Sequence, residues 1–312
     1  MTISAKTIIN TNGLCKKYGE FTAVDNLNLF ISEGEIFGLL GPNGSGKTTI
    51  ILMLLGLTEP TSGTVSVFGF DPVKEPFRVK RLCGYLPEKI GFYENLTAGQ
   101  NLRYFARLNG MPQNDMITQI DKTLHDVGLG VHKDTKVSKF SKGMKQRLGL
   151  ANVLFKEPRL IILDEPTQGI DPKGIEEILD LLTEINNEVG ATILLSSHLI
   201  HHVQQVCDNI GIMGKGRMRK RGKIKNIEDT FEKNWIIEIE VRDINESILR
   251  SISELPDVRW VKSDGNMIFV ECQRDIRSEL SLAIISKGGS LMGLRLVERT
   301  LGDIYKMYSE VP

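Results

Sequence analysis

The sequence has 312 residues, of which 41% are hydrophobic and 25% are charged, and this fits an ordinary globular protein with about two domains. Lysine and arginine together number 39, as do aspartate and glutamate, so the formal net charge is zero. A balanced charge gives no overall attraction to nucleic acid or to anionic lipid, so no nucleic-acid partner is expected.

The cysteines and the apolar runs exclude further classes. The four cysteines are scattered and form no CxxC pair, which argues against a disulfide framework or a thiolate metal site and favours a reducing cytosol. The N-terminal residues lack the apolar core of a signal peptide. The longest apolar run, near Ile50 to Leu57, is much shorter than the ~18 residues of a membrane span, so a separate chain is expected to supply any membrane part.

Short apolar runs alternate with helical patterns over about the first 226 residues, as they do in α/β folds. Buried strands are predicted at residues 35–40, 160–163 and 192–195, with a further alternating strand at 64–68. An apolar helix is predicted over 48–57. The mostly helical pattern between 97 and 158 predicts a helical block, spanning about 88–158, inserted between strands.

The pattern changes after about Asn226. The remaining residues predict a strand, a helix, a hairpin around the turn sequence Ser263 to Asn266, a second helix, a last strand and a short helix. In chain order the first five of these cover about 235–241, 245–255, 258–272, 274–287 and 290–298, and the short helix follows. The β-α-β-β-α-β order predicts a small α+β domain of the ferredoxin-like kind. Two domains are therefore expected, at 1–226 and 227–312.

The run LLGPNGSGKTT, Leu39 to Thr49, satisfies the pattern G-x-x-x-x-G-K-[ST] between a predicted buried strand and an apolar helix. Glycines allow backbone N–H groups to curl around phosphate oxygens, and the start of a helix adds positive potential. Lys47 would neutralise the β- and γ-phosphates, and the Thr48 hydroxyl would bind Mg²⁺. The alternative is a glycine-rich turn that binds nothing, which the strand and helix on either side argue against. The predicted nucleotide-binding residues here are Gly41, Pro42, Asn43, Gly44, Ser45, Gly46, Lys47, Thr48 and Thr49.

The run LIILDEP, Leu160 to Pro166, ends a predicted buried strand with two carboxylates. Beside the phosphate loop, Asp164 would hold Mg²⁺ and Glu165 would orient or deprotonate the attacking water. The alternative is an ordinary strand followed by a capped turn, which accounts equally well for a DE pair alone.

Together with FSKGMKQRLGLA, Phe140 to Ala151, these runs resemble in order the motifs of the ATP-binding cassette (ABC) ATPases, the motor subunits of ABC transporters. The resemblance covers about Ile8 to Asn226. It implies a P-loop NTPase fold with a RecA-like core, a helical subdomain and a β subdomain. It also implies ATP and Mg²⁺ as ligands.

The resemblance implies that FSKGMKQRLGLA serves the nucleotide of a second ATPase subunit in a head-to-tail homodimer. Ser141 and Gly143, at the start of a helix, would offer a hydroxyl and backbone N–H groups to the γ-phosphate. A plain helix cap by Ser141 is the alternative, and both can hold. Lys142 and Met144 stand where the family usually has glycine and glutamine.

Tyr18 and Glu88 match two further family positions. Tyr18 stands where the family stacks an aromatic ring on adenine, with a surface hairpin tyrosine as the alternative. Glu88 replaces a usual glutamine that touches Mg²⁺ and water, with a solvated glutamate as the alternative. A carboxylate can bind Mg²⁺ but cannot donate a hydrogen bond, so an altered dependence on Mg²⁺ or pH is expected.

The resemblance assigns roles to Asp171 and His198 as well. Asp171 would communicate between the two sites, although Asp-Pro is also an ordinary helix start. His198 would contact the γ-phosphate. The alternatives are a core histidine or a metal site, since His202 lies one helical turn away, but HLIHH lacks the acid of HExxH.

Two surface segments remain. The basic run from Lys215 to Lys225 is predicted to be a solvated hairpin, because it lacks the aromatic residues that would stack on nucleic-acid bases. Phe92, Tyr93 and Leu96 are candidates for a groove that docks membrane subunits, with local core packing as the alternative.

The implied function is ATP hydrolysis coupled to transport through separate transmembrane permease subunits, with the chain at the cytoplasmic face of the membrane. The closing run RTLGDIYKMYSE resembles the tail of exporter-type subunits and favours export. The alternatives are a soluble ABC ATPase acting in DNA repair, translation or cluster assembly, and a binding module without turnover.

Overall fold

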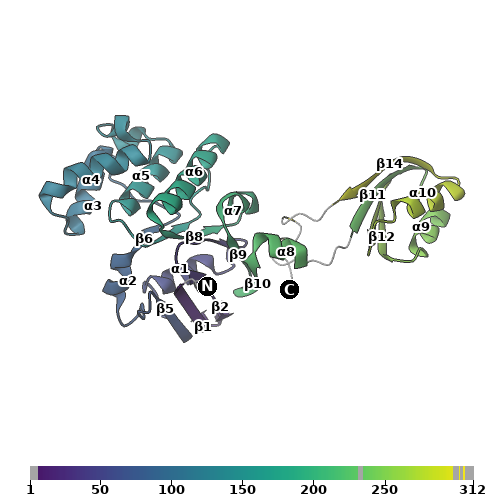
Figure 1. The fold of residues 1–312 in the computed structure, drawn as a ribbon, viewed down its shortest axis with the longest axis horizontal. Coiled ribbons are helices and arrows are strands. Elements are labelled where there is room, and N and C mark those ends of the chain that lie inside the picture. Colours follow the sequence, from purple (N-terminus) through teal and green to yellow (C-terminus); the bar gives the residue numbers. More distant parts are fainter. Residues whose placement is uncertain (1–5, 231–234, 298–301, 303–304, 306–312) are drawn as a thin grey trace, which may run out of the picture. The chain divides into compact units, whose positions relative to one another are not determined.

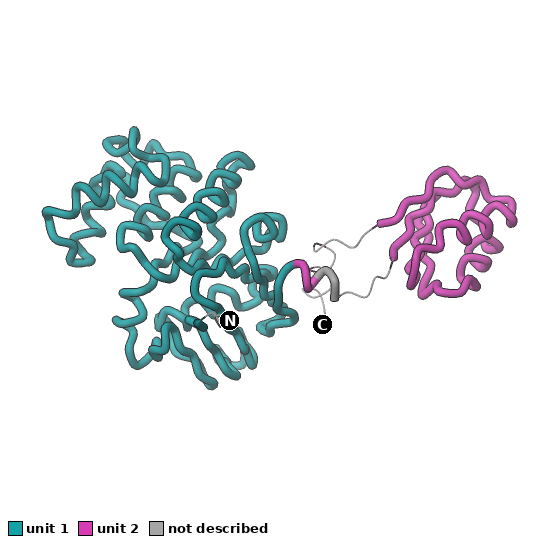
Figure 2. Tube along the Cα trace, in the orientation of Figure 1, with its two compact units in different colours: residues 1–224, 307–312 teal, residues 225–306 magenta. Residues whose placement is uncertain are grey.

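The structure is a computed structural model that describes residues 6–230 and 235–297, with Gly302 and Tyr305. The described residues form two compact units, one ending at Ile224 and the other beginning at Lys225 (Figure 2). The helix predicted after residue 298 lies largely outside the described residues. None of the helices described is both long enough and apolar enough to cross a membrane.

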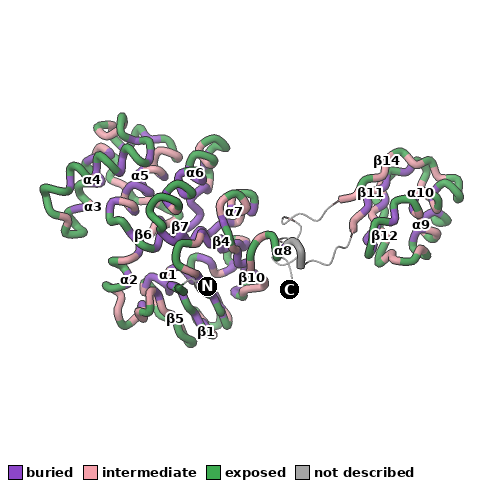
Figure 3. The backbone as a smooth tube through the Cα atoms, viewed as in Figure 1, coloured by how far each residue is buried: buried purple, intermediate pink, exposed green. Residues whose placement is uncertain are grey.

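The first unit is built on a six-stranded sheet in which five strands are parallel and the edge strand β10 runs antiparallel to its neighbour β9 (Figure 1). The spatial order is β10 (Arg217–Lys223), β9 (Asn209–Gly214), β4 (Ile36–Leu40), β8 (Thr192–Ser197), β7 (Leu160–Asp164) and β6 (Cys83–Leu86). Every residue of β4, β7 and β8 is buried (Figure 3). The three buried strands predicted from apolar runs are therefore confirmed, and they lie side by side.

A second, antiparallel sheet of four strands packs beside the first, with β1 pairing to the other three. Its strands are β1 (Thr7–Tyr18), β2 (Phe21–Leu27), β3 (Phe30–Ser32) and β5 (Ser62–Val67). The helix α1 (Lys47–Leu54) shares one hydrophobic core with both sheets, through residues such as Ile50 and Leu54. A helix that is apolar on all sides is stable only in such a buried position.

The predicted helical block is present. It consists of α3 (Ala98–Leu108), α4 (Gln113–Asp126) and α5 (Lys142–Leu154), with two short 3₁₀ turns, η1 (Gly130–His132) and η2 (Val137–Lys139). A capping box starts α3, because the Thr97 side chain accepts from the Gln100 N–H and the Gln100 side chain accepts from the Thr97 N–H. The other helices of this unit are α2 (Pro76–Leu82), α6 (Pro172–Val189) and α7 (Ile200–Val206), and α8 (Ile224–Thr230) follows β10.

The second unit has the predicted β-α-β-β-α-β order, with an antiparallel sheet in the order β12-β13-β11-β14. This is the arrangement of a ferredoxin-like fold. Its elements are β11 (Trp235–Arg242), α9 (Glu246–Ser253), β12 (Val258–Asp264), β13 (Met267–Cys272), α10 (Arg277–Ser286) and β14 (Ser290–Val297). Alternate residues of β11, namely Ile237, Ile239 and Val241, enter its core.

Candidate functional site

The carboxyl ends of the central strands meet at one edge of the six-stranded sheet. Leu40 of β4 lies opposite Ser197 of β8, and Ser196 lies opposite Asp164 of β7. The phosphate loop follows β4, the acidic pair ends β7 and His198 follows β8, so the topology brings all three together. In open parallel sheets this edge is where ligands bind.

The phosphate loop requires glycine where it enters α1. Gly46 has φ +102°, and a Cβ at this position would lie 2.5 Å from the backbone oxygen of Ala23. No side chain caps the start of α1 at Gly46, and the first turn of α1 contains no acidic residue. Its backbone N–H groups are therefore available to an anion.

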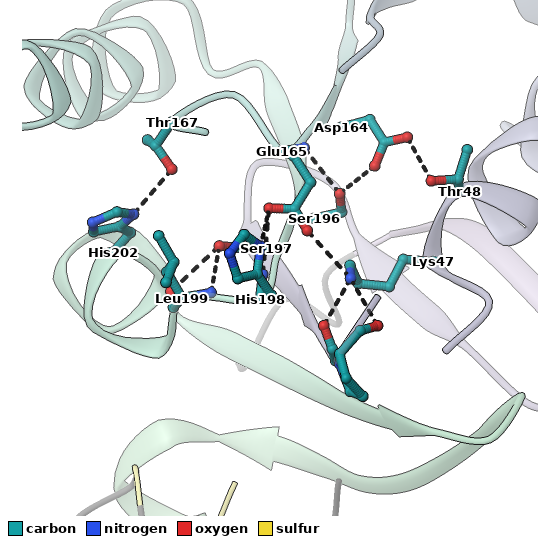
Figure 4. A network of polar contacts seen from close by, with 12 residues as sticks. Lys47, Thr48, Asp164, Glu165, Thr167, Ser196, Ser197, His198, Leu199 and His202 are labelled. Carbon is teal, nitrogen blue, oxygen red and sulfur yellow. Dashed lines mark hydrogen bonds and ion pairs between the residues drawn. The ribbon is translucent and has the colours of Figure 1, made fainter. Parts of the chain in front are cut away.

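Lys47 is almost completely buried, with 6% of its surface exposed. Its ammonium group donates to the backbone oxygens of Gly41 at 2.7 Å and Pro42 at 3.3 Å, and it lies 3.2 Å from Glu165 Oε1. The side chain thus folds back over the phosphate loop (Figure 4). This geometry holds a positive charge where a bound phosphate needs it.

Asp164 is also buried, and both of its carboxylate oxygens accept hydrogen bonds. Thr48 Oγ1 donates to Oδ2 at 2.8 Å, and Ser196 Oγ donates to Oδ1 at 2.5 Å. The Thr48 hydroxyl and the Asp164 carboxylate form a pair of oxygens of the type that Mg²⁺ prefers. No group of three or more His, Cys, Asp or Glu side chains within the described ranges could hold a metal unaided. The pair fits Mg²⁺ nonetheless, because Mg²⁺ commonly takes its remaining ligands from water and substrate phosphates.

Glu165 is held from several sides. Its backbone has φ +50°, an uncommon conformation for a residue other than glycine, and its N–H donates to the Ser196 backbone oxygen at 3.2 Å and to Ser196 Oγ at 3.1 Å. Its Oε2 lies 2.8 Å from His198 Nδ1. Its Oε1 faces Lys47 as an ion pair and, among the described residues, accepts no hydrogen bond. A strained backbone around a carboxylate that is fixed in this way is typical of functional sites.

Tyr85 of β6 feels the charge of the Asp164 carboxylate. Burial, with the charges of Asp164 and Glu88, raises the pKa of Tyr85 to about 12. Its hydroxyl therefore stays neutral and does not act as a base at neutral pH.

A pocket of about 270 Å³ opens onto the phosphate loop. The pocket is lined by Phe21, Ala23, Asn43, Gly44, Ser45, Gly46, Lys47, Thr48, Thr49, Glu88 and Glu165. It therefore unites most of the predicted phosphate-loop residues with Glu88 and Glu165. A larger hollow of about 770 Å³ along α6 is lined by acidic and neutral residues, so it does not suit a polyphosphate.

Phe21 is a pocket residue that the sequence analysis missed. It pairs with Tyr18 across the hairpin between β1 and β2, and both rings are about half exposed, at 62% for Phe21 and 49% for Tyr18. The Lys16 ammonium lies 4.9 Å from the centroid of the Tyr18 ring. The aromatic residues on either side of the Gly19-Glu20 turn are the signal that could have found Phe21, because side chains of paired residues lie on one face of a hairpin.

The FSKGMKQRLGLA segment lies apart from this pocket. Ser141 is the exposed N-cap of α5 and accepts from the Met144 N–H at 3.2 Å, as the capping alternative predicted. Asp171 likewise caps α6, accepting from the Gly174 N–H at 3.3 Å. Ser141, Gly143 and Asp171 are not among the residues that line the pocket. A single chain therefore does not bring them to its own phosphate loop.

Lys142 lies against Gly169 in the loop before α6. A Cβ at Gly169 would be 2.3 Å from Lys142 Nζ, and Gly169 has φ +69°. Lys142, one of the residues that depart from the family pattern, thus links the start of α5 to the segment that follows the acidic pair.

The two histidines of HLIHH face different partners. His198 Nδ1 lies 2.8 Å from Glu165 Oε2, whereas His202 Nδ1 lies 2.9 Å from Thr167 Oγ1 (Figure 4). They do not converge on a shared metal position. The observed partners thus favour separate roles for the two rings over a shared metal site.

Comparisons with known proteins agree with this site. The ABC transporter family matches residues 24–168. The bacitracin transport ATP-binding protein BcrA of Bacillus licheniformis is 36% identical, with 96% of each chain covered. BcrA of Enterococcus faecalis is 39% identical over 96% of this chain and 95% of its own. A solved dimeric bacterial ABC transporter cassette is 27% identical, with a TM-score of 0.62, over 69% of this chain and 98% of its own.

The family match includes the phosphate loop and the acidic pair, and the relatives extend over nearly the whole chain, including the second unit. The chain therefore belongs to the ATP-binding subunits of ABC transporters, and it is an ATPase that binds ATP and drives transport.

Proposed function

We propose that two copies of this chain form the motor of an exporter, acting through separate membrane subunits at the cytoplasmic face of the membrane. The observation that carries the proposal is the buried Glu165 carboxylate, held between Lys47 and His198 at the open end of the phosphate loop. A carboxylate fixed beside a polyphosphate site can act on an attacking water.

The residues of the phosphate loop would bind the β- and γ-phosphates of ATP through backbone N–H groups and Lys47. Thr48 and Asp164 would hold Mg²⁺, and Glu88 lines the same pocket as Thr48. The metal supplies positive charge that offsets the charge developing on the phosphates. Phosphate oxygens would compete with Glu165 for the Lys47 ammonium, which frees the carboxylate to accept a proton from water.

His198 would keep Glu165 aimed at the γ-phosphate. Its Nδ1 bonds to Glu165 Oε2, and its side chain remains 31% exposed towards the open side of the site. The imidazole can therefore hold the Glu165 carboxylate and also reach a bound phosphate.

The adenine would stack on the aromatic residues at the tip of the β1–β2 hairpin. Lys16 lies over the Tyr18 ring at 4.9 Å, and Phe21 borders the phosphate-loop pocket. Stacking on such rings tolerates many bases, so most of the selectivity would have to come from other contacts.

The dimer would complete each site with the start of α5 from the other copy. Ser141 is exposed and Gly143 lies in the first turn of α5, and neither borders the pocket of its own chain. A helix start attracts anions through its free N–H groups. The dimeric cassette among the related structures supports the pairing of two copies.

The helical block would contact the membrane subunits through an aromatic cluster. Phe92 packs edge-on against Phe105, which fits local packing, whereas Tyr93 and Tyr104 are 50% and 40% exposed and pack on each other. Exposed tyrosines are favoured interface anchors. The two BcrA relatives are named transport proteins, which gives no support to the alternative of a soluble ABC ATPase acting in DNA repair, translation or cluster assembly.

The names of the two BcrA relatives suggest bacitracin as the first cargo to examine. Deleting the gene should lower the bacitracin concentration that stops growth, and unaltered protein should restore it where Glu165→Gln does not. Equal sensitivity in all strains would exclude this cargo.

The proposal is tested by measuring ATP hydrolysis over a range of protein concentrations, with Glu165→Gln in parallel. Hydrolysis should rise faster than linearly with protein, because two copies build each site. Glu165→Gln should be inactive and form an ATP-dependent dimer by sedimentation. A rate strictly proportional to protein concentration, with no dimer, would contradict the proposal.

A further inference from the structure

We propose that Thr167 and His202 form a positioning contact that holds the Glu165 segment in its working geometry. This inference rests on the proposed role of Glu165 as the base. Thr167 Oγ1 lies 2.9 Å from His202 Nδ1, and Thr167 is only 2% exposed. The contact joins the segment after the acidic pair to the first turn of α7.

The helix α7 contacts this segment at two points. His198, just before the helix, bonds to the Glu165 carboxylate, and His202, one turn later, bonds to Thr167 (Figure 4). Only Pro166 separates Glu165 from Thr167. Two contacts fix both the position and the direction of a short segment, whereas one contact leaves it free to rotate.

The helix is itself a firm support. Val203, beside His202, is fully buried, and it packs so closely on β4 that a Cβ at Gly38 would lie 2.2 Å from Val203 Cγ1. The position of His202 is therefore set by the central sheet. Because Thr167 is bonded to a side chain of this anchored helix, the segment from Glu165 is tied to the sheet as well.

The strained backbone of Glu165 is the reason why the Thr167–His202 contact matters. A residue other than glycine at φ +50° tends to relax unless its surroundings hold it. On the N-terminal side, the Glu165 N–H donates to Ser196. The Thr167–His202 contact holds the chain downstream, so the strained residue is fixed on both sides.

The charge state of His202 suits a structural bond. Burial, and then electrostatic interaction with the imidazoles of His201 and His198, lower the pKa of His202 from its usual value, while the Glu165 carboxylate opposes this. The imidazole is therefore neutral near pH 7, and its Nδ1 can accept from the Thr167 hydroxyl or donate to it.

The test compares ATP hydrolysis and ATP affinity in paired variants. Thr167→Val removes the hydroxyl and keeps the shape, and Thr167→Ser restores the hydroxyl. His202→Leu removes the ring nitrogens, and His202→Asn places an amide near the position of Nδ1. We expect kcat to fall about fivefold in Thr167→Val and His202→Leu with the ATP dissociation constant unchanged, since one hydrogen bond is lost. Thr167→Ser and His202→Asn should stay within about twofold of the unaltered chain.

His201→Leu is the matched control, because His201 is the exposed neighbour of His202 on the same helix. It should leave kcat unchanged. The double variant Thr167→Val/His202→Leu should be no worse than either single variant, since both remove one shared contact.

Nuclear magnetic resonance of the imidazole nitrogens supplies a readout that is independent of activity. The chain has five histidines, so the His202 signals can be assigned by their loss in His202→Asn. Thr167→Val should move the His202 Nδ1 signal and leave that of His201 in place. An unmoved His202 signal would overturn the contact.

The outcomes separate this inference from the proposed function. Unchanged kcat in both Thr167→Val and His202→Leu, with Glu165→Gln inactive, would overturn the positioning role alone. Additive losses in the double variant would do the same. Hydrolysis by Glu165→Gln at the unaltered rate would instead show that the assigned base is wrong, and the inference would fall with it.

Discussion

Lys47 and Ser141 both stand at the start of a helix, yet their surroundings differ. Lys47 is 6% exposed and bonded to the loop around it and to Glu165, whereas Ser141 is exposed and, within the described part of the chain, bonded only to the turn that it caps. The phosphate-loop side is thus assembled within one chain before any ligand arrives. The signature side, Phe140 to Ala151, has hydrogen-bond donors at the start of α5 but does not reach the phosphate-loop pocket of its own chain. By our proposal, it meets the nucleotide bound to a second copy.

Lys47→Met should produce the largest change and would break the phosphate-loop side directly. The loss of a charged donor to phosphate should weaken ATP binding about ten- to hundredfold at every protein concentration. The variant should also melt at a lower temperature, since Glu165 keeps a buried charge without its partner. Calorimetric titration with ATP measures the first effect and thermal unfolding the second.

Lys80→Met, at an exposed position of α2, is the matched control and should change neither quantity. Unweakened ATP binding by Lys47→Met would mean that the phosphates bind elsewhere.

Gly143→Asp should have the next largest effect, and it tests the signature side. A carboxylate facing a γ-phosphate should lower hydrolysis by about tenfold or more, because like charges meet at close range. ATP affinity of the dilute single chain should not change. Gly143→Ala is the control, since a Cβ there meets Ile170 only at an ordinary 3.5 Å.

Mixing Gly143→Asp with Glu165→Gln sharpens the same comparison. Glu165→Gln alone should be inactive and Gly143→Asp alone strongly impaired, but a mixed dimer has one site with an intact Glu165 and an intact Gly143. Activity should therefore reappear on mixing, as measured by phosphate release. If mixing restored nothing, the two sides would have to belong to one chain.

Phe21→Ala should have a moderate effect, confined to the binding of the adenine base. Loss of one stacking ring should weaken ATP binding about fivefold and leave the binding of inorganic tripolyphosphate, which has no base, unchanged. Phe77→Ala on α2, where the ring is 79% exposed, is the control. Equal losses for ATP and tripolyphosphate would instead indicate damage to the phosphate loop.

Lys142→Gly should have the smallest effect. Its ammonium lies on the loop at Gly169, near the surface that the second copy would meet, and an exposed charge contributes little. ATP-dependent dimerisation should weaken about twofold at low salt, and the difference should vanish at high salt. Lys142→Met keeps the stem and removes the charge, so an effect in Lys142→Gly alone would assign the contact to the stem.

Much of the fold was readable from local patterns. The three central strands are uninterrupted apolar runs, which is the pattern of strands buried on both faces, and β11 alternates as a half-buried strand does. The first three strands, β1, β2 and β3, were not predicted. They are polar in part, and β1 has register shifts in its pairing with all three of its partners, so their periodicity is weak.

The candidate site could be predicted from the sequence wherever its functional residues lie within a short motif. The phosphate loop and the acidic pair each occupy a few consecutive residues. Ser196 and Phe21 were missed because each acts through residues distant in the sequence, Ser196 through Asp164 and Phe21 through the phosphate loop. A serine at a strand end carries no sign of such a partner, and the one sign of Phe21 is its place opposite Tyr18 across the Gly19-Glu20 turn.

By itself the sequence determined the α/β class, the phosphate loop, the acidic pair and the family, because each depends on residue order alone. Tertiary structure decided which side chains meet: that Lys47 pairs with Glu165, that His202 bonds to Thr167 rather than sharing a metal with His198, and that Ser141 stays outside its own pocket. The physical reason is that parallel strands bring distant residues to one edge of the sheet. Contacts across that edge depend on the registration of the strands, which no local pattern records.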